Sequence, residues 1–136
     1  MEKVYYLSKE GRERVKAKSI RKKTPNVQHF LLRNQLWLYL KCPATWKNEV
    51  RIKVGDKSII CDAMYQYEKN HLFVEVDCSQ PMSVNKKKIE KYRQIRDITK
   101  QPFYLVWVTE LESRRAKLKE LSKDLPCVVF TLKDIL

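Results

Sequence analysis

Residues 51–77 read RIKVGDKSIICDAMYQYEKNHLFVEVD, and their pattern predicts three consecutive antiparallel strands. The first, EVRIKV from Glu49, alternates apolar and polar side chains and ends at the hairpin turn signal Gly55–Asp56. The second, KSIICDAMYQY, is rich in β-forming residues. A turn at EKN then leads into the third, HLFVEVDC, so the segment predicts a β-meander.

The third predicted strand carries two carboxylates among its apolar residues. Successive side chains of a strand point to opposite faces of the sheet. One face therefore carries Leu72, Val74, Val76 and Cys78, and the other carries Phe73, Glu75 and Asp77. This pattern leaves two interpretations open: the acids form a metal-binding catalytic edge, or they lie on the solvated side of the sheet.

Helices and further strands surround this meander. Apolar residues at near-helical spacing predict a buried helix over residues 27–40. A second helix follows Pro81, with an inward stripe of Val84, Ile89, Tyr92 and Ile95. FYLVWVT, a charged helix over residues 112–122 and CVVFTL complete the chain. We therefore expect an α/β fold with a mixed β-sheet flanked by helices, in the order α-β-β-β-α-β-α-β.

Composition indicates a polyanionic partner. The 136 residues include 29 Lys and Arg against 16 Asp and Glu, a net charge of +13, which favours nucleic acid. No apolar run approaches about 18 residues and no leader is evident, so we expect a cytoplasmic protein without a membrane partner. The four cysteines lack C-x-x-C spacing, which favours reduced thiols over a zinc site or disulfides.

Two basic segments are candidates for contact with nucleic acid. Residues 1–23 predict a short strand followed by a solvated basic helix or arm, and NKKKIEKYRQIR places further cations beside the carboxylates. The residues expected to bind nucleic acid are Lys9, Arg12, Arg14, Lys16, Lys18, Arg21, Lys22, Lys23, Lys86, Lys87 and Lys91.

Three carboxylates on neighbouring strands predict a metal site. Asp62 lies in the middle of its strand, where an unpaired charge is costly, and Glu75 and Asp77 project from one face of the next strand. Carboxylate oxygens suit Mg²⁺ or Mn²⁺, and such an ion can activate water for phosphodiester hydrolysis. If the protein is not catalytic, we expect no cofactor.

The order of these elements, with an acid on the second strand and E-x-[acid or Lys] on the third, resembles the restriction-endonuclease-like PD-(D/E)xK superfamily. Four stretches resemble the replication-relaxation family of bacterial plasmids and mobile elements: YYLSKEGRERV, HFLLRNQLWLYL, residues 51–77 and KKKIEKYRQI with FYLVWVT. The resemblance covers nearly the whole chain. It implies that residues 1–23 are the remnant of a winged-helix region and that residues 24–136 form a PD-(D/E)xK-like domain.

The resemblance also implies roles for individual residues. Asp62 matches the first acid of the motif and Glu75 the second, so both would ligate the metal. Asp77 stands where the motif has its lysine. Lys88 would supply the missing ammonium from the following helix, with Lys91 and Lys53 as weaker choices, and Glu49 would be a further acid on the metal side.

These observations favour a DNA-binding protein of plasmid or mobile-element replication and relaxation, with a nuclease-like core that is either degenerate or active. The alternatives are an active Mg²⁺-dependent DNA endonuclease, using Asp62, Glu75, Asp77 and Lys88, and a non-catalytic module that binds a replication or mobilisation protein. The sequence does not determine the oligomeric state.

Overall fold

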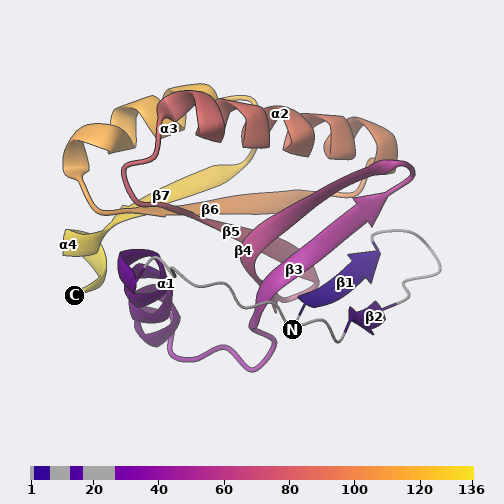
Figure 1. The fold of residues 1–136 in the computed structure, drawn as a ribbon, viewed down its shortest axis with the longest axis horizontal. Helices are drawn as coiled ribbons and strands as arrows, with labels where there is room; N and C mark the ends of the chain where they lie inside the picture. The colour runs from indigo at the N-terminus through magenta and orange to yellow at the C-terminus, as the bar shows by residue number, and fades with distance from the viewer. Residues whose placement is uncertain (1, 7–12, 17–26) are drawn as a thin grey trace.

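The alternating segments of residues 47–77 form the antiparallel part of a mixed sheet in a computed structural model, which describes residues 2–6, 13–16 and 27–136 (Figure 1). The strands are β1 (Glu2–Tyr6), β2 (Glu13–Lys16), β3 (Lys47–Val54), β4 (Lys57–Tyr67), β5 (Asn70–Asp77), β6 (Phe103–Thr109) and β7 (Cys127–Thr131). The helices are α1 (Val27–Tyr39), α2 (Met82–Thr99), the 3₁₀ turn η1 (Glu112–Arg114), α3 (Arg115–Leu121) and α4 (Leu132–Ile135).

The sheet is mixed, in the order β2-β1-β3-β4-β5-β6-β7. β3, β4 and β5 form the expected antiparallel meander, whereas β5, β6 and β7 run parallel because helices connect them. β1 pairs in parallel with β3 and antiparallel with β2, which extends the sheet at this edge. The α/β class and a mixed sheet flanked by helices are thereby confirmed.

Helices cover both faces of the sheet (Figure 1). One core lies under α2 and α3 and includes Phe73, Tyr92 and Trp107. The other lies under α1 and α4 and includes Leu36 and Val74. The two faces expected for β5 are confirmed, but the face with Glu75 and Asp77 is not solvated, because α2 covers it.

An irregularity interrupts β3 and β4 where Asp62 lies. Cys61 packs in the core under α2, but Ala63 packs in the core under α1, so the alternation of β4 shifts by one residue at Asp62. Opposite this point Glu49 of β3 has a positive φ of 52°. The register between β4 and β5 also ends at the Ala63–Val74 pair. Glu75 therefore lies just beyond the point where the two strands separate.

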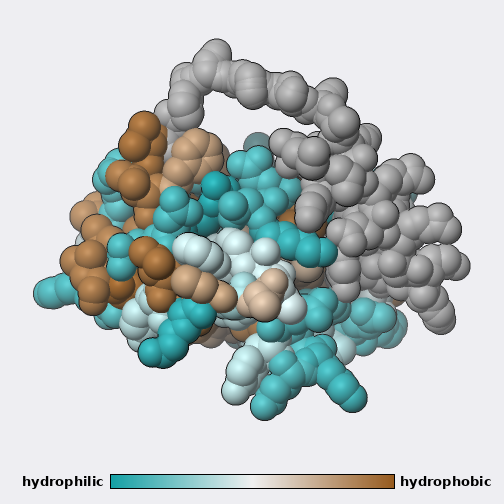
Figure 2. Space-filling view, turned by 90° about the horizontal axis from the view of Figure 1, so that it is seen from below, coloured by the Kyte–Doolittle hydropathy of each residue, from teal (hydrophilic) through white to brown (hydrophobic). Residues whose placement is uncertain are grey.

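The helices differ in part from the expected pattern. Val84 is 41% exposed at the first turn of α2, outside the inward stripe predicted for it, and Val27 and Leu31 of α1 also face outward. Val27 and Leu31 belong, with Leu38, to the exposed apolar side chains of α1, and Figure 2 shows hydrophobic surface gathered at one end of this face.

The N-terminal expectation is partly wrong. Residues 13–16 form strand β2 where a basic helix or arm was predicted, because pairing with β1 satisfies their backbone groups in a ladder. Residues 7–12 and 17–26 lie outside the described part of the chain, and so do six of the predicted DNA contacts: Lys9, Arg12, Lys18, Arg21, Lys22 and Lys23.

Two further expectations concern cysteines and membranes. Cys42, Cys61, Cys78 and Cys127 are free cysteines in this structure. Within the described ranges, none of the helices has the length and apolar character needed to cross a bilayer.

Candidate functional site

Asp62 lies where β4 separates from β5. The backbone ladder between the two strands is interrupted there, and the Asp62 carboxylate accepts a hydrogen bond from β5 instead. The Val76 amide donates to Asp62 Oδ2 at 2.7 Å, and His29 Nε2 of α1 lies 3.2 Å from Oδ1. Burial acts to raise the pKa of Asp62, but the hydrogen bond from His29 and the charge of Lys88 outweigh it and lower the pKa. Asp62 is therefore held as a carboxylate.

Helix α1 supports this irregular point through Arg33. Its guanidinium, largely buried, donates from Nη1 to Glu49 Oε2 and to the Asp62 carbonyl oxygen, both at 3.4 Å. The same group lies 4.9 Å from the centre of the Phe30 ring. Glu49, predicted as a further acid on the metal side, is thus engaged by Arg33 beside Asp62.

Glu75 is a buried acid of the predicted site, with 1% of its surface exposed. Lys88 Nζ donates to Oε1 at 2.7 Å, and the Tyr92 hydroxyl donates to Oε2 at 2.5 Å. Burial, and then the negative charge of Asp62, raise the pKa of Glu75 to about 8, although Lys88 and Tyr92 counteract the rise. Near neutral pH this position can therefore hold or release a proton.

Lys88 of α2 donates a hydrogen bond to Glu75 and interacts electrostatically with Asp62. Burial acts to lower its pKa, but the charges of Glu75 and Asp62 and the bond to Glu75 outweigh it and raise the pKa. The structure thus brings Asp62, Glu75 and Lys88 into one cluster of interacting charges. Lys88 is the residue that was expected to replace the missing lysine of the motif. Its catalytic role stays a prediction.

Asp77 belongs to a different network. Arg114 of η1 donates from Nε to Oδ2 at 2.6 Å and from Nη2 to Oδ1 at 2.9 Å. Asn85 donates to Oδ1 and Thr109 to Oδ2. Burial acts to raise the pKa of Asp77, but these bonds outweigh it and lower the pKa. Both oxygens of Asp77 are therefore engaged, and the residue joins β5, α2, β6 and η1.

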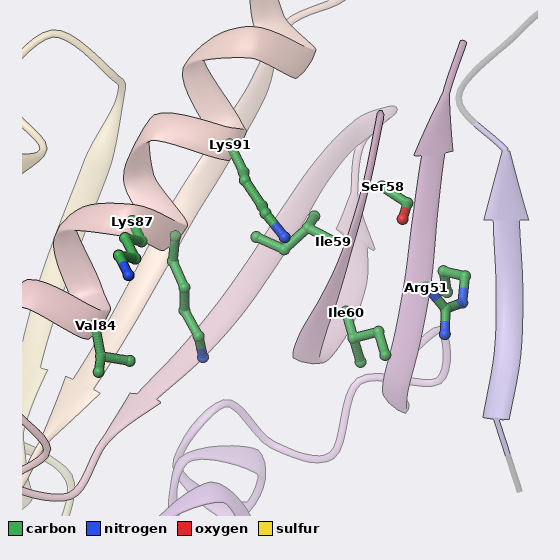
Figure 3. Close-up of a pocket in the computed structure, with 8 residues that line it drawn as sticks. Arg51, Ser58, Ile59, Ile60, Val84, Lys87 and Lys91 are labelled. Atoms are coloured by element: carbon green, nitrogen blue, oxygen red, sulfur yellow. The ribbon is translucent and has the colours of Figure 1, made fainter. Parts of the chain in front are cut away.

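The predicted basic residues of α2 lie along one side of a groove. Lys87 and Lys91 line it together with Lys88, while Lys86 is exposed on the same helix outside the lining (Figure 3). Arg14 and Lys16 lie in β2 at the edge of the sheet, where their backbone alone is described. The structure therefore places part of the predicted DNA-binding surface directly beside the charge cluster.

The carboxylate oxygens of Asp62 and Glu75 are ligands of the type that Mg²⁺ and Mn²⁺ prefer. Mg²⁺ is commonly held by one or two carboxylates, with water and phosphate oxygens completing its coordination. Among the residues that the structure describes, no group of three or more His, Cys, Asp or Glu side chains could hold a metal ion. Asp62 and Glu75 would thus supply two ligands, and an ion at Glu75 Oε1 would have to displace Lys88.

Four residues that complete these networks were not assigned to the site from the sequence. Tyr92 was expected only as part of an apolar stripe, and His29, Arg33 and Arg114 were not expected at the site. Only Tyr92 carried a usable signal, since it lies four residues after Lys88 on the same helix face.

Comparison with known proteins gives one match. A family model described as Replication-relaxation matches residues 1–104, about three quarters of the chain. None of the curated proteins and none of the solved structures compared with the chain matches it. The match includes β4, β5 and α2, which carry Asp62, Glu75 and Lys88. The chain belongs to the replication-relaxation family.

Proposed function

We propose that this protein binds DNA in the replication or relaxation of a plasmid or other mobile element, through a nuclease-like core. The observation that carries the proposal is the convergence of Asp62, Glu75 and Lys88 beside a groove lined by basic residues. Family membership supports the biological setting, since it suggests a role in replication or relaxation of mobile elements.

Charge supports DNA as the partner. The net charge of +13 raises the local concentration of a polyanion, and Lys86, Lys87 and Lys91 present ammonium groups on exposed positions of α2. Asp62 and Glu75 lie behind Lys88, so the surface offered to a phosphate at this point is cationic. A phosphate backbone is bound mainly through such contacts.

The proposal predicts DNA binding that weakens steeply with salt, because each phosphate contact releases counterions from the DNA. Fluorescence anisotropy of the whole chain with labelled duplex DNA at several salt concentrations measures this. Absence of binding would overturn the proposal.

A second candidate is metal-dependent hydrolysis of a DNA phosphodiester. The placement of Lys88 favours it, because an ammonium group beside two carboxylates is the charge arrangement of the PD-(D/E)xK motif. Asp62 and Glu75 would hold Mg²⁺ or Mn²⁺, which supplies an activated water and stabilises charge on the phosphate when bound. Lys88 would then be free to contact a phosphate oxygen in place of Glu75.

Incubation of supercoiled plasmid with the protein in Mg²⁺ or Mn²⁺ tests this second candidate. If the protein cleaves DNA, open circles form, and Glu75→Gln slows their formation by about 100-fold or more, since it removes a ligand and a proton-transfer group. Lys117→Gln on the exposed side of α3 is the matched control and should leave the rate unchanged. A plasmid that stays supercoiled, or equal nicking by Glu75→Gln, would eliminate cleavage and leave the binding proposal standing.

A further inference from the structure

A groove separates the first half of α2 from the β3–β4 hairpin. It lies beside residues 57–62 of β4, which are not paired with β5, because the ladder between these two strands covers only Ala63 to Tyr67 of β4. The space measures about 410 Å³ and is open on one side. Its lining is Arg51, Ser58, Ile59, Ile60, Val84, Lys87, Lys88 and Lys91 (Figure 3).

Basic side chains line both sides of this groove. Lys87 and Lys91 are four residues apart on α2 and therefore project from one face of the helix, while Arg51 lies opposite on β3 (Figure 3). Both lysines are exposed, and neither forms an ion pair with any residue in the described part of the chain. Among the lining residues that the structure describes there is no acid, so this lining is complementary to a chain of negative charges.

The surface between these cations is apolar. Ile60 and Val84 are 42% and 41% exposed, and the buried Ile59 also lines the groove; Figure 3 shows Lys91 extending from the helix toward Ile59. A ligand made only of phosphate would leave this aliphatic surface exposed to water. The free-energy cost of that exposure is proportional to the apolar area exposed. The groove therefore suits a ligand that combines phosphates with apolar faces at close intervals.

We infer that the groove binds a single strand of DNA, with phosphates on Lys87 and Lys91 and the faces of a base or deoxyribose on Ile60 and Val84. The inference rests on the proposed DNA-binding function and specifies the form of DNA. A duplex stacks its bases inside and presents mainly its backbone, whereas a single strand exposes the faces of its bases to an apolar surface.

Lys88 connects this groove to the buried acids. It lines the groove and at the same time donates to Glu75 Oε1. A strand in the groove thus runs directly past the Asp62–Glu75–Lys88 cluster, and melted DNA is the form expected there during replication or relaxation.

Anisotropy with a labelled oligothymidine and with a duplex of the same length tests the inference. We expect tighter binding of the single strand, and Lys87→Gln/Lys91→Gln should weaken it about tenfold. Ile60→Thr keeps the charge and β propensity but removes apolar surface, and should weaken the single strand about threefold while leaving the duplex unchanged. Lys117→Gln/Lys119→Gln removes the same charge from exposed positions of α3, which packs on the edge strand β7, and is the matched control.

Three results would overturn the inference, and they show whether DNA binding itself is lost. Duplex binding without a preference for the single strand, or equal losses in the groove and control variants, would reject the groove as the single-strand site and leave DNA binding intact. Failure to bind either form of DNA would reject the proposed function together with the inference.

Discussion

Replacing Arg114 with alanine is expected to lower the free energy of unfolding by about 3–5 kcal/mol, since removing one partner of a buried ion pair leaves an uncompensated charge. Asp77 is fully buried, and its two charge-assisted hydrogen bonds come from the Arg114 guanidinium. Asn85 and Thr109 alone cannot neutralise the remaining carboxylate. Chemical denaturation of the wild type and the variant at neutral pH measures the difference.

Two further variants show whether the buried charge is the cause. Arg96→Ala removes an arginine of α2 whose ion pairs to Asp97 and Asp124 lie at the surface, and should cost no more than about 1 kcal/mol. Asp77→Asn in the Arg114→Ala background removes the orphaned charge and should recover part of the lost stability. Equal losses for Arg114→Ala and Arg96→Ala would contradict the structural role of the Asp77 network.

Glu75→Gln is expected to change how stability depends on pH. The pKa of Glu75 is raised from an ordinary value of 4.5 to about 8, so the folded state holds a proton that the unfolded chain has already released. The stability that this proton contributes to the folded state is fully present below pH 4.5 and is lost as the pH rises to about 8. Within that interval, the wild type should lose about 1.4 kcal/mol per pH unit relative to Glu75→Gln, which carries no titrating group.

Unfolding free energies of both proteins between pH 5 and 9 provide this comparison. Glu90→Gln is the matched control, because Glu90 is an exposed glutamate on the same helix, and its curve should run parallel to that of the wild type. Parallel curves for the wild type and Glu75→Gln would mean that Glu75 titrates near its ordinary pKa, and would contradict the buried environment described for it.

The sequence predicts the local features of the site because they follow from the period of the secondary structure. Alternation in β5 places Glu75 and Asp77 on one face, and the four-residue spacing from Lys88 to Tyr92 places both on the inner side of α2. These periods do not show that α2 lies over the acidic face. The choice between a solvated and a covered face therefore stayed open until the packing of the helix was known.

The partners of the acids could not be predicted, since they come from distant parts of the chain. Arg114 is 37 residues from Asp77, and His29 belongs to a helix that precedes the meander. The shift in alternation at Asp62 is also hidden, because a β-strand irregularity depends on the neighbouring strand as well as on its own residues. The expected alternation alone would have continued through this point.

In the N-terminal segment, the secondary structure predicted from the sequence was partly wrong. Its basic composition indicated a helix or an arm, but composition does not reveal that residues 13–16 can pair with β1 and so extend the sheet. β-structure depends on such pairing more than helical structure depends on distant contacts. The short strand predicted at the start of residues 1–23 was easier to recognise, because Val4, Tyr5 and Tyr6 have high β propensity.

The salt dependence of DNA binding by the whole chain is the decisive measurement. If Lys and Arg side chains neutralise several phosphates, the logarithm of the association constant falls linearly with the logarithm of salt concentration, with a slope of about −0.9 for each phosphate contacted. We expect a slope steeper than about −3, corresponding to four or more phosphates. A slope near zero, or no binding at low salt, would contradict the proposal that this member of the replication-relaxation family acts on DNA.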